Sequence, residues 1–118
     1  MTKARDELGR RAETMVAQLL EAKGFSVVAR NARVGRLEID LIARRGALLV
    51  VCEVRARMNA CFMHPIESID RAKVERIRRA TAQWLAKTRV GTSLVRFDAA
   101  SVVFDTPQGT LTYFEDAF

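Results

Sequence analysis

Apolar residues recur at helical spacing in two stretches of the chain. The first stretch predicts an amphipathic helix over about residues 5–23, and Gly24 follows it at the position where glycine commonly ends a helix. Its apolar positions are Leu8, Ala12, Met15, Val16, Leu19 and Leu20. The second stretch predicts a helix from about Ile69 to Lys87. Its inner side is expected to carry Val74, Ile77, Thr81, Trp84 and Leu85.

The remaining apolar segments have the length and alternation of strands. A short strand is predicted at residues 25–29, followed by a polar turn region around residues 31–35. Two more strands are expected at residues 94–104 and 110–114, with a turn at Pro107-Gln108-Gly109 between them. Each of these segments is too short for a membrane span.

Between the two helices, a hairpin is predicted from two strands with different patterns. Residues 37–41 alternate apolar and acidic side chains, which is typical of a strand with one buried face and places Glu38 and Asp40 together. Residues 47–57 are more continuously apolar and predict a central strand. A turn at Arg45-Gly46 would set Glu38 opposite Glu53 and would leave all three carboxylates on one side of the sheet.

The element order αβββαββ predicts an α/β fold in which helices flank a mixed five-stranded sheet. A chain of 118 residues is long enough for one such domain and short for two, so a single domain is expected. The N-terminus lacks the apolar core of a secretory signal, and the longest apolar run, Ala47 to Cys52, is only strand-sized. We therefore expect a cytoplasmic protein that does not enter membranes.

The charge balance favours polyanions as partners. Twenty Lys and Arg residues against fourteen Asp and Glu residues give a net charge of +6 and an isoelectric point near 10.1. Nucleic acid would be attracted to such a protein, although the same excess of charge also serves ordinary solubility. Composition alone does not separate DNA from RNA.

The acidic residues of the hairpin indicate a metal site. Like charges on neighbouring strands repel each other, so a compensating cation is expected between them. Oxygen ligands suit Mg²⁺ or Mn²⁺, which can activate water and stabilise charge on a phosphate. Alternatively, Glu38, Asp40 and Arg55 form the solvated face of a hairpin, on which Arg55 neutralises its neighbours. Glu53 weakens that alternative because it interrupts an apolar strand that should be well covered.

Several segments together resemble one known family. Asp40 followed by Glu53-Val54-Arg55 is similar to the PD-(D/E)XK pattern of the restriction-endonuclease-like superfamily. The wider match resembles the YraN family of small bacterial proteins, which are similar to archaeal Holliday junction resolvases. It rests on Gly9-Arg10-Arg11-Ala12-Glu13, Arg30-Asn31, Leu37-Glu38-Ile39-Asp40-Leu41-Ile42, Val51-Cys52-Glu53-Val54-Arg55-Ala56-Arg57, Lys73 and Arg96-Phe97-Asp98.

The resemblance implies a restriction-endonuclease-like core and a metal-dependent DNA endonuclease, acting on branched or repair-intermediate DNA. Glu13, Asp40 and Glu53 would be metal ligands or acid/base groups, and Glu38 an accessory acid. Arg55 stands where the superfamily has a catalytic lysine. An arginine can stabilise charge on a phosphate, but it does not readily deprotonate to act as a base. Because the related resolvases act as two-fold dimers, the resemblance leaves homodimerisation open.

Basic residues of the second helix complete the expected site. Lys73 is interpreted first as an ordinary solvent-facing cation, with a turn towards the hairpin as the alternative that would replace the missing lysine. A set of arginines is assigned to salt-dependent contact with the phosphate backbone. It comprises Arg71, Arg76, Arg78 and Arg79. Two further hypotheses stay open: a non-catalytic nucleic-acid-binding module on a nuclease scaffold, and a protein-interaction adaptor with a basic helix.

Overall fold

A computed structural model describes residues 3–58, 70–92 and 94–118, and it confirms the predicted α/β class and element order. The elements are α1 (Lys3–Ala22), β1 (Ser26–Val34), β2 (Leu37–Arg45), β3 (Leu48–Arg57), α2 (Arg71–Thr88), β4 (Leu94–Val103) and β5 (Thr110–Phe114). The strands form one five-stranded sheet in the order β1-β2-β3-β4-β5, in which only the β3–β4 pair is parallel. This mixed sheet agrees with a restriction-endonuclease-like core.

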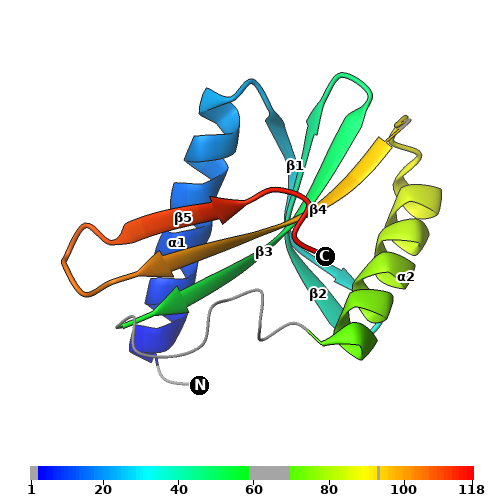
Figure 1. The fold of residues 1–118 in the computed structure, drawn as a ribbon. Coiled ribbons are helices and arrows are strands. Elements are labelled where there is room, and N and C mark those ends of the chain that lie inside the picture. The colour runs from blue at the N-terminus through cyan, green and yellow to red at the C-terminus, as the bar shows by residue number, and fades with distance from the viewer. Residues whose placement is uncertain (1–2, 59–69, 93) are drawn as a thin grey trace.

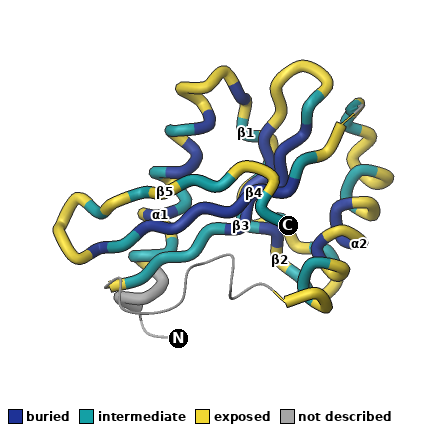
Figure 2. Tube along the Cα trace, in the orientation of Figure 1, coloured by how far each residue is buried: buried dark blue, intermediate teal, exposed yellow. Residues whose placement is uncertain are grey.

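The two helices cover opposite sides of the sheet (Figure 1). Ala12, Val16 and Leu20 of α1 pack on one face, whereas Ile77 and Ala80 of α2 belong to a second cluster on the other. Strands β3 and β4 therefore lie between two apolar layers and carry long buried runs (Figure 2). Their continuous hydrophobicity follows from this double coverage.

Strand β1 is longer than its apolar pattern predicted. It continues to Val34, so the polar turn expected around residues 31–35 is wrong, and only Gly35 and Arg36 separate β1 from β2. As an edge strand, β1 leaves much of its surface to solvent, which permits the polar side chains that suggested a turn. A register shift between Val27 and Ala29 also interrupts its ladder with β2.

The β2–β3 hairpin turns one residue later than predicted. Arg45 pairs with Leu48 across Gly46 and Ala47, and Gly46 takes a positive φ of 59°. This slides the register by two residues, so that continuing it places Asp40, rather than Glu38, opposite Glu53. The predicted Glu38–Glu53 pair is therefore wrong, while a shift of two keeps every side chain on its predicted face.

The β2–β3 ladder ends at the pair Leu41 and Cys52, although both strands continue beyond it. From there β2 stays with β1 and β3 stays with β4, and the two strands diverge (Figure 1). We call this divergence the strand fork and define it by residues 37–40 of β2 and 53–57 of β3. Asp40 and Glu53 lie at its apex, whereas Glu38 lies further along β2.

Helix α2 begins where its capping residue allows. The carboxylate of Asp70 accepts a hydrogen bond from the backbone N–H of Lys73 at 2.7 Å, an N-cap that satisfies one of the free donors of the first turn. Arg89 ends the helix in the left-handed conformation. Across residues 3–58, 70–92 and 94–118, neither helix has the length and apolarity required to cross a membrane.

Candidate functional site

Asp40 lies at the apex of the strand fork, and its carboxylate replaces the backbone acceptor that a paired β2 strand would offer to β3. Its Oδ2 accepts a hydrogen bond from the backbone N–H of Val54 at 2.9 Å. Asp40 lies one residue, and Val54 two residues, beyond the last ladder pair of Leu41 and Cys52. The carboxylate thus satisfies a β3 donor that the diverging β2 backbone no longer reaches. This bond fixes Asp40 against β3 and directs it towards Glu53.

Glu53 is a buried carboxyl beside a second acid. It is only 5% exposed, and burial together with the neighbouring Asp40 raises its pKa to about 7. Burial likewise raises the pKa of Asp40, against the opposing effect of the Val54 hydrogen bond. The negative charge of Asp40 disfavours ionisation of Glu53, so the pair retains a proton more readily than isolated carboxyls do.

One oxygen of this acid pair has no partner. Glu53 Oε1 is buried and makes no hydrogen bond within the part of the chain that the structure describes. A buried carboxylate oxygen normally has a donor or a cation, because leaving it bare costs about 1–3 kcal/mol or more. The fork therefore presents an unsatisfied carboxylate oxygen beside a second acid, which a further hydrogen-bond donor or a cation could satisfy.

Lys73 points at the acid pair. Its Nζ lies 3.7 Å from Glu53 Oε2, and its side chain is 24% exposed. The first interpretation of Lys73 as an ordinary solvent-facing cation is therefore wrong. The helical pattern placed it near the outer side of α2, but a lysine on the flank of a helix can extend its stem across the neighbouring surface and deliver its charge inwards.

Arg55 lies on the same face of β3 as Glu53 and contributes a second positive charge. Its charge opposes the upward shift of the Glu53 pKa, as that of Lys73 does. Arg55 Nε is buried without a hydrogen-bond partner among the described residues. Two cations from different elements thus flank one acid pair.

Glu13 approaches the fork from α1. Its carboxylate accepts a hydrogen bond from Asn31 Nδ2 at 3.2 Å and lies 3.9 Å from Arg30 Nη2. Burial raises the pKa of Glu13, and the charge of Asp40 adds to the increase, which places the two acids within electrostatic reach. Even so, no three His, Cys, Asp or Glu side chains in the described ranges are close enough together to hold a metal ion. Glu13 stands near the pair rather than in a common ligand cluster with it.

Glu38 lies outside the acid pair. It is exposed and pairs with Arg33 in the β1–β2 ladder, so the accessory acid of the sequence prediction is a surface residue of the fork. Because the true register places Asp40 against Glu53, Glu38 falls two residues further along the diverging strand.

The four arginines assigned to phosphate contact are all exposed on α2. Three of them, Arg71, Arg76 and Arg79, make no side-chain hydrogen bond, ion pair or ring contact with the residues that the structure describes. Arg78 differs, because its Nη2 donates to the carbonyl of Phe118 at 3.1 Å and its guanidinium lies 4.6 Å from the centre of the Phe97 ring. Arg78 thus has a role in packing that sequence periodicity did not reveal.

A buried polar cluster around Asp98 was not predicted. Asp98 is fully buried and accepts hydrogen bonds from Arg96, from the Tyr113 hydroxyl at 2.5 Å and from the backbone N–H of Asp116. Burial raises the pKa of Tyr113, so that its hydroxyl stays a donor. An acid within the apolar run of β4 was the available signal. Since its acceptors are satisfied internally, this cluster anchors the C-terminal residues to the sheet.

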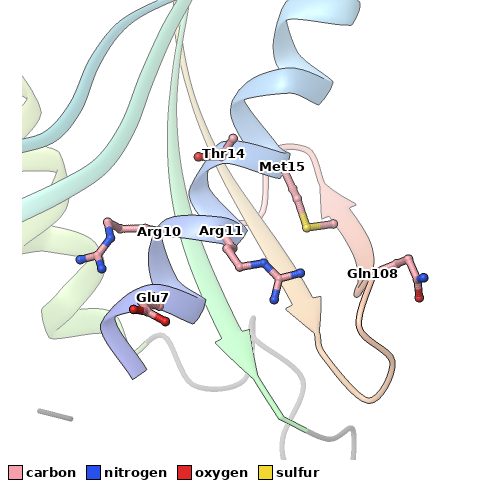
Figure 3. Close-up of a pocket in the computed structure, with 6 residues that line it drawn as sticks. All are labelled: Glu7, Arg10, Arg11, Thr14, Met15 and Gln108. Atoms are coloured by element: carbon pink, nitrogen blue, oxygen red, sulfur yellow. The ribbon is translucent and has the colours of Figure 1, made fainter. Parts of the chain in front are cut away.

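A shallow groove lies away from the acid pair, between α1 and the turn that joins β4 to β5 (Figure 3). It is lined by Glu7, Arg10, Arg11, Thr14, Met15 and Gln108. Arg11 is already engaged, because its Nη2 donates to the carbonyl of Pro107 at 2.6 Å and its guanidinium stacks on Phe104. The side chains of Glu7, Arg10 and Gln108 point in different directions and do not converge on one place (Figure 3), so the fork remains the better candidate.

Comparison with known sequences identifies relatives along most of the chain. A family model described as "Uncharacterised protein family UPF0102" matches residues 12–102. A UPF0102 protein of Sorangium cellulosum is 49% identical over 92% of this chain and 77% of its own length. Similar proteins of Acidothermus cellulolyticus and Leifsonia xyli are 39% and 41% identical, over 98% and 84% of this chain and 96% and 84% of their own lengths. The range that the family model matches spans the positions of Glu13, Asp40, Glu53 and Lys73.

Proposed function

Since this chain belongs to the uncharacterised protein family UPF0102, which is the YraN family that its motifs resemble, we propose that it is a metal-dependent endonuclease acting on DNA. The proposal is drawn from the chain's own site. The observation that carries the proposal is the pair of Asp40 and Glu53 at the strand fork. A buried acid beside a half-buried one, with one oxygen of the buried acid lacking a hydrogen-bond partner among the described residues, is costly unless a cation neutralises the pair. Fold alone would not justify this function.

The residues at the fork fit Mg²⁺ or Mn²⁺. Such ions bind through one or two carboxylates and keep water for the rest of their shell, so Asp40 and Glu53 suffice as protein ligands. When bound, the ion lowers the pKa of its water and stabilises negative charge on a phosphate. Glu13, which is close to Asp40 but outside a common cluster, acts as an outer carboxylate that orients water.

Arg55 and Lys73 supply the positive charge that a phosphodiester requires. Both flank Glu53, Lys73 by an ion pair of 3.7 Å and Arg55 from the same strand. Arg55 holds a phosphate oxygen through its planar guanidinium, which stays charged at every relevant pH. Lys73 replaces in space the lysine that the superfamily carries two residues after the glutamate.

The outer face of α2 would hold the DNA backbone beside this site. Arg71, Arg76 and Arg79 are exposed on the helix that also delivers Lys73. Each contact with a phosphate adds a modest and salt-dependent contribution to binding. Branched or repair-intermediate DNA is the substrate suggested by the resemblance to junction resolvases.

The test is a panel of duplex, flap and four-way DNA incubated with Mg²⁺ or Mn²⁺. We expect the wild-type protein to cleave at least one structure, and Asp40→Asn to reduce cleavage by a hundredfold or more while keeping the fold. Glu38→Gln, an exposed acid two residues away, is the matched control and should retain cleavage. Equal cleavage by wild type and Asp40→Asn would reject the assignment.

A second candidate function is a nucleic-acid-binding module without hydrolysis. The Lys73–Glu53 ion pair favours it, because a lysine can neutralise the acid pair without any metal. This candidate predicts salt-sensitive DNA binding that is independent of divalent ions and unchanged by Glu53→Gln. The same DNA panel separates the two candidates, since only an endonuclease leaves shorter products.

A further inference from the structure

Asn31 adopts a backbone conformation that strands do not normally contain. It lies within β1 with a positive φ of 53°, in the left-handed region. Non-glycine residues rarely occupy this region, and asparagine is among the few that tolerate it. Such a conformation persists only where its surroundings require it, and it often marks a functional site.

The conformation removes Asn31 from the ladder at the position that faces Asp40. Arg30 pairs with Leu41 and Ala32 pairs with Ile39, so the same register would join Asn31 to Asp40, yet that pair is missing. The side chain of Asn31 turns instead to α1 and donates through Nδ2 to Glu13 Oε1 at 3.2 Å. Arg30, the preceding residue, reaches the same helix and donates to Thr14 Oγ1 at 3.1 Å.

We infer that Asn31 is a positioning residue that holds the Glu13 carboxylate towards Asp40 at the edge of the metal site. The inference rests on the proposed function and assigns to Asn31 a role in it. A glycine would accept the backbone conformation but could not donate to Glu13. An aspartate would accept the conformation and would repel Glu13. Asparagine satisfies both the backbone and the carboxylate.

The electrostatics of Glu13 agree with this role. Its side chain is only 13% exposed, and the negative charges of Asp40 and Glu38 raise its pKa. These influences all favour the protonated acid, whereas the Asn31 hydrogen bond and the charge of Arg30 favour the anion. Without Asn31, the Glu13 carboxylate would lose the hydrogen bond that orients it and one of the two interactions that lower its pKa.

The experiment measures Mn²⁺ binding by isothermal titration calorimetry in the absence of DNA. Asn31→Gly and Asn31→Asp both accept a positive φ and both lack the amide donor, so each should weaken Mn²⁺ binding about tenfold. Arg33→Gln, an exposed change on the same strand, is the control and should bind Mn²⁺ as the wild type does. Thermal unfolding of each variant reports whether it is folded, and Asn31→Asp serves if Asn31→Gly is not.

A double-mutant cycle separates positioning from a general structural role. Glu13→Gln alone should weaken Mn²⁺ binding to a similar extent, and Asn31→Gly should then cause no further loss in the Glu13→Gln background. Wild-type affinity in Asn31→Gly, or an equal loss in both backgrounds, would overturn the inference and leave the proposed function intact. A wild-type protein without any Mn²⁺ site sensitive to Asp40→Asn would instead overturn the proposed function, and this inference with it.

Discussion

The Asp40 carboxylate accepts a hydrogen bond from the backbone N–H of Val54 at 2.9 Å, directly beyond the last pair of the β2–β3 ladder. The Asp40 side chain thereby replaces the backbone acceptor that is missing where the pairing of β2 and β3 ends. The bond explains how two strands can diverge without leaving a buried donor unsatisfied, and it places an acid against Glu53 at the apex of the fork. The geometry of the fold and that of the candidate site thus depend on one contact.

Replacing Asp40 tests both functions of this contact. Asp40→Ala removes the acceptor of the Val54 N–H and should lower the free energy of unfolding by about 1–3 kcal/mol. Asp40→Asn keeps a carbonyl acceptor and removes the negative charge, so it should cost less stability while still abolishing Mn²⁺ binding. Urea unfolding and calorimetry measure the two effects. If Asp40→Asn and Asp40→Ala are equally unstable, the hydrogen bond from the Val54 N–H does not stabilise the fold.

Glu53 should make stability depend on pH. Because its folded pKa of about 7 lies above that of the unfolded chain, the folded state binds more protons between about pH 4.5 and pH 7. The contribution of this group is therefore present at low pH and is lost as the pH rises through 7. The free energy of unfolding of the wild type, measured relative to Glu53→Gln, should fall by about 3 kcal/mol across that window.

Addition of Mn²⁺ provides the control for that measurement. The ion binds the deprotonated pair, so at pH 8 it should raise the unfolding temperature of the wild type and leave that of Glu53→Gln nearly unchanged. A difference between wild type and Glu53→Gln that stays flat from pH 4.5 to pH 8 would contradict the burial of an acid at this position.

Sequence periodicity predicted the elements because each of them buries a clear apolar stripe. Val16 and Leu20 of α1, Ile77 of α2 and the apolar run of β3 all reach zero or near-zero exposure. Periodicity also placed Asp40 and Glu53 on one face, since an even shift of register keeps the face. It could not fix the pairing itself, because Arg45-Gly46 and Gly46-Ala47 are both acceptable turns and only the packed sheet distinguishes them.

The direction of long side chains could not be predicted from the sequence either. Lys73 and Arg78 both lie on the charged side of a helical pattern, yet one reaches Glu53 and the other packs on Phe97. Such contacts depend on where the sheet and the C-terminal residues lie around α2. The turn of Asn31 towards Glu13 is likewise a tertiary effect, since the local sequence suggested only a polar loop.

Lys73 should control the protonation of the acid pair. Its charge lowers the pKa of Glu53, so Lys73→Met should raise that pKa further and shift the pH dependence of Mn²⁺ binding to higher pH. We expect weaker binding at pH 7 and partial recovery at pH 8.5. Lys87→Met, which removes an exposed lysine from the last turn of the same helix, is the control and should leave the pH profile in place. Identical pH profiles of Mn²⁺ binding for the two variants would show that Lys73 does not control the protonation of the acid pair.

Asp98 should matter for stability and not for metal binding. Asp98→Ala leaves Arg96, the Tyr113 hydroxyl and the Asp116 N–H without their buried acceptor. Breaking such a network by removing one partner typically costs 3–5 kcal/mol, which urea unfolding should show. Asp105→Ala, an exposed acid in the following turn, should change stability by less than about 0.5 kcal/mol. A small effect of Asp98→Ala would mean that the network contributes little net stability.

The arginines of α2 should separate into DNA contacts and a packing residue. Arg76 and Arg79 are exposed, and their side chains make no hydrogen bond or ion pair with the described residues. Arg76→Gln and Arg79→Gln should therefore each reduce the salt dependence of DNA binding by about one phosphate contact and leave stability unchanged. Arg78 already binds the Phe118 carbonyl and covers the Phe97 ring, so Arg78→Gln should lower the unfolding temperature and change the salt dependence less. Fluorescence anisotropy over a range of salt concentrations, with Ca²⁺ in place of Mn²⁺ to limit cleavage, measures the first effect, and thermal unfolding measures the second. Equal salt slopes for all three variants and the wild type would mean that α2 does not contact the DNA backbone. The slope reports how many phosphates the protein neutralises, so removing a contacting arginine must change it.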